Sequence, residues 1–142
     1  MSEQTGLAAE RLKHLEFIQA VVTRLGNSSF LIKGWTLTIA AAFFAVLAAK
    51  LNWGVAAVGL IPILGFWFLD GLFLRNERLF RHLYDDVRQA GTKVEPMSMD
   101  TKTYRSKATW QAATFSTTMF LFYGALVLVT VALVVAAVLR RH

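Results

Sequence analysis

The chain has 142 residues, and 56% of them are hydrophobic, which is more apolar surface than a soluble domain of this size needs for its core. Its formal net charge is +6 and it has no cysteine, which excludes disulfides, thiolate nucleophiles and cysteine-based metal sites. Basic loops beside anionic lipid explain the charge better than nucleic acid does. We therefore expect an integral membrane protein that contacts lipid and binds no nucleic acid.

Three long uncharged runs dominate the sequence. They cover residues 34–49, 51–69 and 108–139, which are 16, 19 and 32 residues long. Runs near or above about 18 residues are typical of membrane-spanning helices. The sequence therefore predicts an all-α integral membrane bundle of three transmembrane helices. We expect a single membrane domain over residues 1–142, with spans at residues 30–49, 53–74 and 113–139.

Residues 7–25 precede the first span and carry apolar side chains at three- and four-residue spacing, with charged residues between them. Gly26 is well placed to end a helix there, and Ser28 and Ser29 offer caps for a following helix. We therefore expect a separate N-terminal amphipathic helix over residues 7–25, lying on the membrane or packed against the bundle.

The first two spans are separated by a very short connection, so they should form an antiparallel hairpin. The helical pattern continues past the second span into water, which predicts a cytoplasmic helix over residues 75–90 and then a loop over residues 91–107. One face of that helix is apolar and is a candidate surface for the bundle, a sister subunit or a partner protein. Its members are Leu79, Phe80, Leu83, Tyr84 and Val87.

Basic residues are distributed unevenly between the two sides of the predicted bundle. Twelve Lys and Arg residues, counting Lys33 at the start of the first span, lie before that span or between the second and third, and three lie in the hairpin turn or after the third span. The positive-inside rule then places the N-terminus and the long loop in the cytoplasm. We expect a multi-pass protein of the bacterial inner membrane whose C-terminus lies outside.

Asp70 is the most informative single residue, because an acid inside a span is costly and is usually paired or functional. Its own helix offers no cation at a suitable spacing. Lys33 and Asp70 are equally far from the centre of the hairpin turn, so they should lie at the same depth on adjacent helices. We predict an intramembrane ion pair between them, which either holds the hairpin in register or takes part in a proton or ion path.

Polar residues at helical spacing lead from the long loop into the third span. A stripe of this kind lines a water-filled pore or, alternatively, forms hydrogen bonds to neighbouring helices and to its own backbone. The stripe consists of Lys107, Gln111, Thr114 and Thr118.

Two stretches of the chain resemble a family of small multi-span bacterial membrane proteins. They read FIQAVVTRLGNSSFLIKGW (residues 17–35) and FWFLDGLFLRNERLFRHLYDDVR (residues 66–88). Some members of that family are associated with defence genes such as those of TIR-domain proteins, so the resemblance implies an antiphage membrane effector. It also emphasises seven residues: Arg24, Lys33, Trp35, Asp70, Glu77, Arg78 and Tyr84.

No catalytic set accompanies these features. The three histidines lack metal-ligand spacing, and no phosphate-binding loop, nucleophile elbow or paired carboxylates occur. We therefore expect no enzyme, no metal site and no cofactor. The leading hypothesis is a homo-oligomeric membrane effector or ion-channel-like subunit gated through its cytoplasmic helix. The alternatives are a non-conducting scaffold that recruits a cytoplasmic protein partner and, third, a small transporter.

Overall fold

The computed structural model describes residues 2–50 and 53–139, and every regular element in that part of the chain is helical. The elements are α1 (Ser2–Lys50), α2 (Trp53–Val87), the single 3₁₀ turn η1 (Lys102–Tyr104), α3 (Trp110–Thr114) and α4 (Thr117–Leu139). Three of them, α1, α2 and α4, are long and apolar enough to cross a membrane. The expected all-α bundle is confirmed at this level, and the turn expected at residues 51–52 lies outside the described residues.

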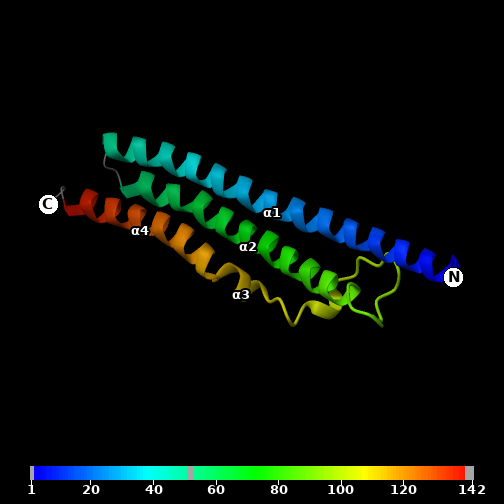
Figure 1. The fold of residues 1–142 in the computed structure, drawn as a ribbon. Helices are drawn as coiled ribbons and strands as arrows, with labels where there is room; N and C mark the ends of the chain where they lie inside the picture. Colours follow the sequence, from blue (N-terminus) through cyan, green and yellow to red (C-terminus); the bar gives the residue numbers. More distant parts are fainter. Residues whose placement is uncertain (1, 51–52, 140–142) are drawn as a thin grey trace.

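The helix α2 occupies the middle of the molecule. It packs along α1 on one side and along α4 on the other, whereas α1 and α4 touch each other only slightly (Figure 1). The short connection between α1 and α2 forces these helices to be antiparallel neighbours. The end of α4 at Leu139 lies near the end of α1 and the start of α2, and the start of α1 lies at the opposite end of the molecule. We call these two ends the turn end and the stalk end.

The separate amphipathic helix expected over residues 7–25 is not supported, because α1 continues without a break from Ser2 to Lys50. Gly26 does not end it, although glycine costs a helix interior about 1 kcal/mol. A Cβ built at Gly26 would lie 3.7 Å from Glu77 Oε2, so α2 passes close to this point and supports the helix. Ser28 donates a hydrogen bond to the Arg24 carbonyl four residues earlier instead of capping a new helix.

The second span and its expected extension form one helix, α2, which contains Pro62 and ends at Val87. This end is three residues earlier than expected, and Gly91 adopts the left-handed φ of +79° in the following turn.

Because 49 residues of α-helix measure about 73 Å and a hydrocarbon core measures about 30 Å, α1 must extend well beyond a membrane. We call residues 2–28, 75–87 and 88–109 together the stalk.

The third apolar run is not one helix from residue 113 onward, as the sequence suggested. The short helix α3 begins after Thr109, whose side chain accepts a hydrogen bond from the Ala112 amide, and it ends at Thr114. The helix α4 then begins after Ser116, whose carbonyl accepts the amide of Phe120 at 2.8 Å. Polar contacts with α2, described below, hold α3 in this separate position.

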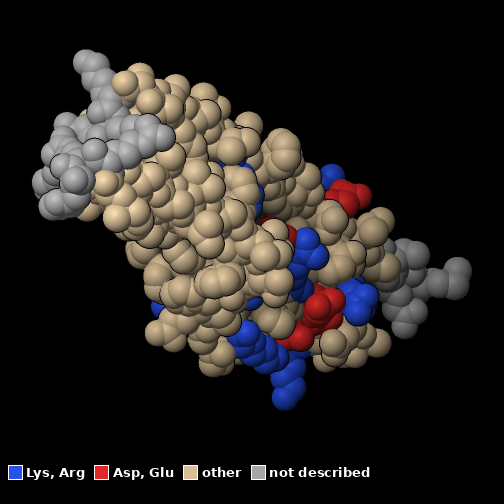
Figure 2. Space-filling view, turned by 90° about the vertical axis from the view of Figure 1, so that its left-hand side faces the viewer, with Lys and Arg blue, Asp and Glu red and all other residues tan. Residues whose placement is uncertain are grey.

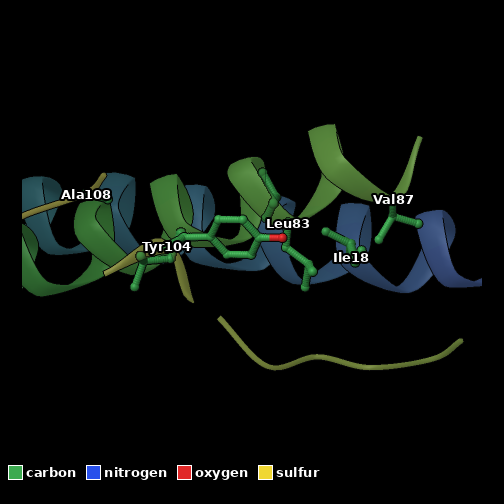
Figure 3. Close-up of a cluster of buried hydrophobic side chains, with 7 residues drawn as sticks. Ile18, Leu83, Val87, Tyr104 and Ala108 are labelled. Atoms are coloured by element: carbon green, nitrogen blue, oxygen red, sulfur yellow. The ribbon is translucent and has the colours of Figure 1, made fainter. Parts of the chain in front are cut away.

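Two hydrophobic clusters hold the helices together. The stalk cluster joins α1, α2 and the connecting segment, and Figure 3 shows its side chains between these elements: Ile18, Val22, Leu79, Leu83, Val87, Tyr104 and Ala108. The second cluster joins the membrane-length parts of α1, α2 and α4: Ala40, Ile63, Met119, Tyr123 and Leu126. Figure 2 shows the charged side chains gathered toward the stalk, while the surface nearer the turn end is largely uncharged.

Candidate functional site

The carboxylate of Asp70 is completely buried and lies where α1, α2 and α4 meet. Lys33 Nζ lies 2.5 Å from Asp70 Oδ2, so the contact expected between these two residues is present. Ser29 Oγ donates to Asp70 Oδ1, and Tyr123 Oη donates to Asp70 Oδ2 at 3.1 Å. Both oxygens of the acid are therefore satisfied by side chains of two other helices.

The α1 side of this network is a local arrangement. Ser29 and Lys33 are four residues apart, so they share one helix face, and Lys33 Nζ also donates to Ser29 Oγ at 2.8 Å. The Lys33 side chain keeps 22% of its surface exposed, whereas Asp70 has none. The Lys33 side chain thus has partial access to the surroundings while the carboxylate depends entirely on its protein partners.

Sequence reasoning missed Ser29 and Tyr123 as members of the network. Ser29 carried a detectable signal, because a hydroxyl four residues before Lys33 on a helix faces the same neighbour. Tyr123 is a phenol within the long third apolar run, where a buried hydroxyl needs a partner. Trp67 stacks on its ring, with 5.8 Å between ring centroids and an interplanar angle of 2°, and so fixes its orientation toward Asp70.

Three side chains of α2 bind carbonyl groups of α3 and of Ala108, two residues before it. Trp67 Nε1 donates to the Thr114 carbonyl at 3.0 Å, Arg75 Nε to the Ala108 carbonyl at 3.2 Å, and Arg78 Nη1 to the Ala112 carbonyl at 3.0 Å. The carbonyls at the end of a helix lack partners within it, so side-chain donors are a natural way to satisfy them. These bonds explain why α3 is held apart from α4.

Gly71 permits the close approach of α3. A Cβ built at Gly71 would collide with Thr114 Oγ1 and would also lie 3.3 Å from Trp110 Nε1. Thr114 Oγ1 and Trp110 Nε1 are buried and make no hydrogen bond among the described residues. The contact is therefore one of tight packing, one residue along α2 from Asp70.

The predicted polar stripe does not form one continuous surface. Thr114 is buried against Gly71, whereas Gln111 and Thr118 are exposed. Lys107 precedes α3 and lies with its Nζ 5.7 Å from the centre of the Tyr104 ring. The break between α3 and α4 separates these residues, so they line no common path within one chain.

The apolar face of the stalk part of α2 is covered by other parts of the same chain. Leu79, Leu83 and Val87 are 4%, 1% and 2% exposed and pack against α1 and the connecting segment (Figure 3). Phe80 and Tyr84 are partly buried at the edge of the same cluster. This face serves the intramolecular core of the stalk and is not free for a partner protein.

The connecting segment is bound to both stalk helices by polar contacts. His14, on α1, is almost fully buried and its Nε2 lies 2.7 Å from the Ser98 carbonyl. Tyr104 Oη donates to Asp86 Oδ2 on α2 at 2.7 Å. Burial raises the pKa of Tyr104 to about 12, and the hydrogen bond to Asp86 and the charge of Asp86 add to the effect.

The comparisons with known proteins return no relative. No family model matches the chain, and neither a curated protein nor a solved structure matches it. Within residues 2–50 and 53–139, no group of three or more His, Asp or Glu side chains is placed to hold a metal ion. The strongest candidate site in the described part of the chain is thus the Asp70 network.

Proposed function

We propose that this protein is the subunit of a homo-oligomeric membrane effector of the bacterial inner membrane, channel-like in its action and controlled through its stalk. The observation that carries the proposal is the buried charge of Asp70, held by Ser29, Lys33 and Tyr123 from two other helices. A buried ion pair is rarely more stable than well-packed apolar residues of similar volume. A charged network kept at this position is therefore better explained by a function than by stability alone.

The position of the network supports control by the stalk. Asp70 lies on α2 only nine residues before Leu79, the first member of the stalk cluster on that helix. Because α1 and α2 are both continuous through this region, a rearrangement of the stalk would move Lys33 relative to Asp70. Such a change would strand a buried carboxylate, which gives the network two states of different energy.

Ion passage would require several copies of the chain. The polar residues expected to line a pore do not share a path within one chain, but Gln111 and Thr118 are exposed on the outer surface of α3 and α4. Thr118 lies in an open hollow of about 550 Å³ together with Leu37 and Leu121. In our proposal these outward polar groups face sister subunits, and conduction occurs at that interface.

A liposome flux assay on the purified protein tests the proposal. We expect the wild type to pass monovalent ions and its overexpression to arrest bacterial growth. The double variant Lys33→Met with Asp70→Asn should assemble normally but lose flux by at least about tenfold, because it removes the charges without stranding either one. The matched control Lys13→Met removes an exposed lysine of the same helix as Lys33 and should keep its flux. Absence of both wild-type flux and growth arrest would refute the proposal.

The proposed orientation has the N-terminus and the stalk in the cytoplasm, in accord with the excess of basic residues there. Reporter fusions at both ends check it. A fusion before Met1 should report a cytoplasmic location, and a fusion after His142 should report an external one. The same location for both ends would mean that one of the three membrane-length helices does not cross.

A second candidate, the non-conducting scaffold, is favoured by a different part of the stalk. Phe17, Met97 and Met99 are 46%, 45% and 37% exposed and surround a hollow of about 420 Å³ beside Arg24. In this case the protein would conduct nothing and would co-purify with a soluble partner. Phe17→Asp should then abolish the co-purification, whereas Leu12→Asp, a change at a different exposed apolar residue of α1, should not.

A further inference from the structure

Two arginines lie side by side where the stalk meets the membrane-length part of the molecule. Arg75 and Arg78 are three residues apart on α2, so they share one helix face. Both are half-buried, and each donates one hydrogen bond to a backbone carbonyl, of Ala108 and Ala112 respectively. A guanidinium group has five N–H donors, so each arginine is positioned by one bond and retains most of its donors.

The acids in the stalk part of α2 are engaged with other partners. Among the described residues, neither Arg75 nor Arg78 forms an ion pair with a carboxylate. The acids of the same helix bind elsewhere: Glu77 with Arg81 at 2.6 Å, Asp85 with Arg88 at 3.2 Å, and Asp86 with the Tyr104 hydroxyl at 2.7 Å. Two positive charges at one level of the molecule thus have no ion-pair partner in the part of the chain that the structure describes.

Aromatic side chains indicate where that level lies in a membrane. Trp110 packs on Phe68 with 5.1 Å between ring centroids, and Trp67 meets Phe115 edge-on at 5.9 Å. Tryptophan concentrates at the boundary between hydrocarbon and headgroups. Arg75 is seven residues beyond Phe68 on α2, about 10 Å further toward the stalk, which is the level of the lipid phosphates.

From this arrangement we infer that Arg75 and Arg78 bind the phosphodiester of an anionic phospholipid headgroup. Arginine favours phosphate because its planar donors match two phosphate oxygens at once. Phe68 and Phe115 lie nearer the turn end than the arginines do, and they are 53% and 61% exposed. An acyl chain would therefore have apolar surface to cover. That surface favours a lipid over free phosphate.

Thermal unfolding of the full-length protein in detergent micelles tests the assignment. Dioleoyl phosphatidylglycerol, dioleoyl phosphatidylcholine and glycerol 3-phosphate are titrated separately. We expect a saturable rise in melting temperature with phosphatidylglycerol only. The variant Arg75→Gln with Arg78→Gln should bind that lipid about 30-fold more weakly, since each basic residue near the surface contributes about fivefold.

The matched control is Arg81→Gln with Arg88→Gln, which removes the same charge from α2 and from the residue directly after it. These arginines are already paired with acids, and Arg81 is about 9 Å further from the membrane than Arg75, beyond a Debye length of about 8 Å. The control variant should bind phosphatidylglycerol less than about threefold more weakly than the wild type. Equal losses of phosphatidylglycerol affinity in the two double variants would mean that the lipid responds only to the overall positive charge of the stalk. That result would overturn the inference.

The other outcomes also decide the matter. If glycerol 3-phosphate raised the melting temperature as much as phosphatidylglycerol does, the site would bind free phosphate. That result would overturn the lipid assignment. An unchanged melting temperature with phosphatidylglycerol would also overturn the lipid assignment. If the double variant does not fold, Arg75→Gln and Arg78→Gln are measured singly, and each should weaken binding about fivefold. Unchanged affinity in both single variants would refute the site.

Discussion

Lys33 and Asp70 stand equally far from the turn between α1 and α2, and their side chains meet, with Nζ 2.5 Å from Oδ2. The two residues differ in whether the side chain can reach polar surroundings when the contact between them is lost. Lys33 keeps 22% of its side chain exposed and can reach polar surroundings, whereas Asp70 is fully buried and cannot. The pair is therefore asymmetric, and this asymmetry can be measured.

We expect Lys33→Met to destabilise the protein more than Asp70→Asn does. The first change strands a buried carboxylate, at a cost of about 3 to 5 kcal/mol, whereas the second leaves a lysine that can extend outward. The double variant should be more stable than Lys33→Met alone. Unfolding by denaturant in mixed micelles measures the free energies. Additive losses in the double variant would show that the two residues do not act as a pair.

Gly71→Ala should destabilise the contact between α2 and α3. The new Cβ would collide with Thr114 Oγ1, and forcing a methyl group into a packed contact costs about 1 to 3 kcal/mol. Gly65→Ala is the matched control on the same helix, because a Cβ there meets nothing within 4 Å. Adding Thr114→Ala should recover part of the loss. A Gly71→Ala protein as stable as the Gly65→Ala protein would contradict the observed packing.

Leu83→Ala should cost about 2 to 5 kcal/mol of stability, because Leu83 is 1% exposed in the stalk cluster and its truncation leaves a cavity. Leu12→Ala, at a leucine that is 61% exposed, should change stability by less than about 0.5 kcal/mol. Protease sensitivity of the connecting segment gives a second readout, since Leu83 packs beside it. Equal stability of the two variants would mean that the stalk core is not formed in solution.

Tyr104 should make the stalk sensitive to high pH. Folding raises the pKa of Tyr104 from 10.0 to about 12, so the neutral phenol is favoured in the folded state. Its contribution to stability is complete below about pH 10 and is lost as the pH rises toward 12. Tyr104→Phe should remove the hydrogen bond to Asp86, at a cost of about 1 kcal/mol at neutral pH.

The pH profile of Tyr104→Phe separates this effect from other alkaline transitions. The variant should lose less stability between pH 10 and 12 than the wild type does, as followed by helical circular dichroism. Tyr84→Phe is the control, because Tyr84 lies in the same cluster but does not bond Asp86. Identical alkaline profiles for all three proteins would exclude Tyr104 as the titrating group.

Charge spacing alone was enough to predict the three membrane-length helices and the depth of Lys33 relative to Asp70. Both depend on regular helix geometry, in which residue number translates directly into distance. The local signals around Gly26 led to a wrong helix boundary. They describe an isolated segment, whereas the packing of α2 along α1 outweighs a single glycine.

The break between α3 and α4 could not be predicted either, because the run from residue 108 to residue 139 carries no charge, glycine or proline near Phe115 to mark an end. What holds α3 apart comes from another helix. Trp67, Arg75 and Arg78 bind its carbonyls, and Gly71 lets it approach. Contacts of this kind join residues more than 30 positions apart and leave no local trace in the sequence.

The unbroken course of α1 makes it a lever. Taking the bond at Lys33 as the pivot, the arm toward Ser2 is 31 residues, about 46 Å, and the arm toward Lys50 is 17 residues, about 26 Å. A rigid rod with these arms reduces a sideways displacement at its free tip by nearly half at the other end, and reverses its direction. A tilt at the start of α1 would therefore reach the turn end of the molecule as a smaller and opposite motion.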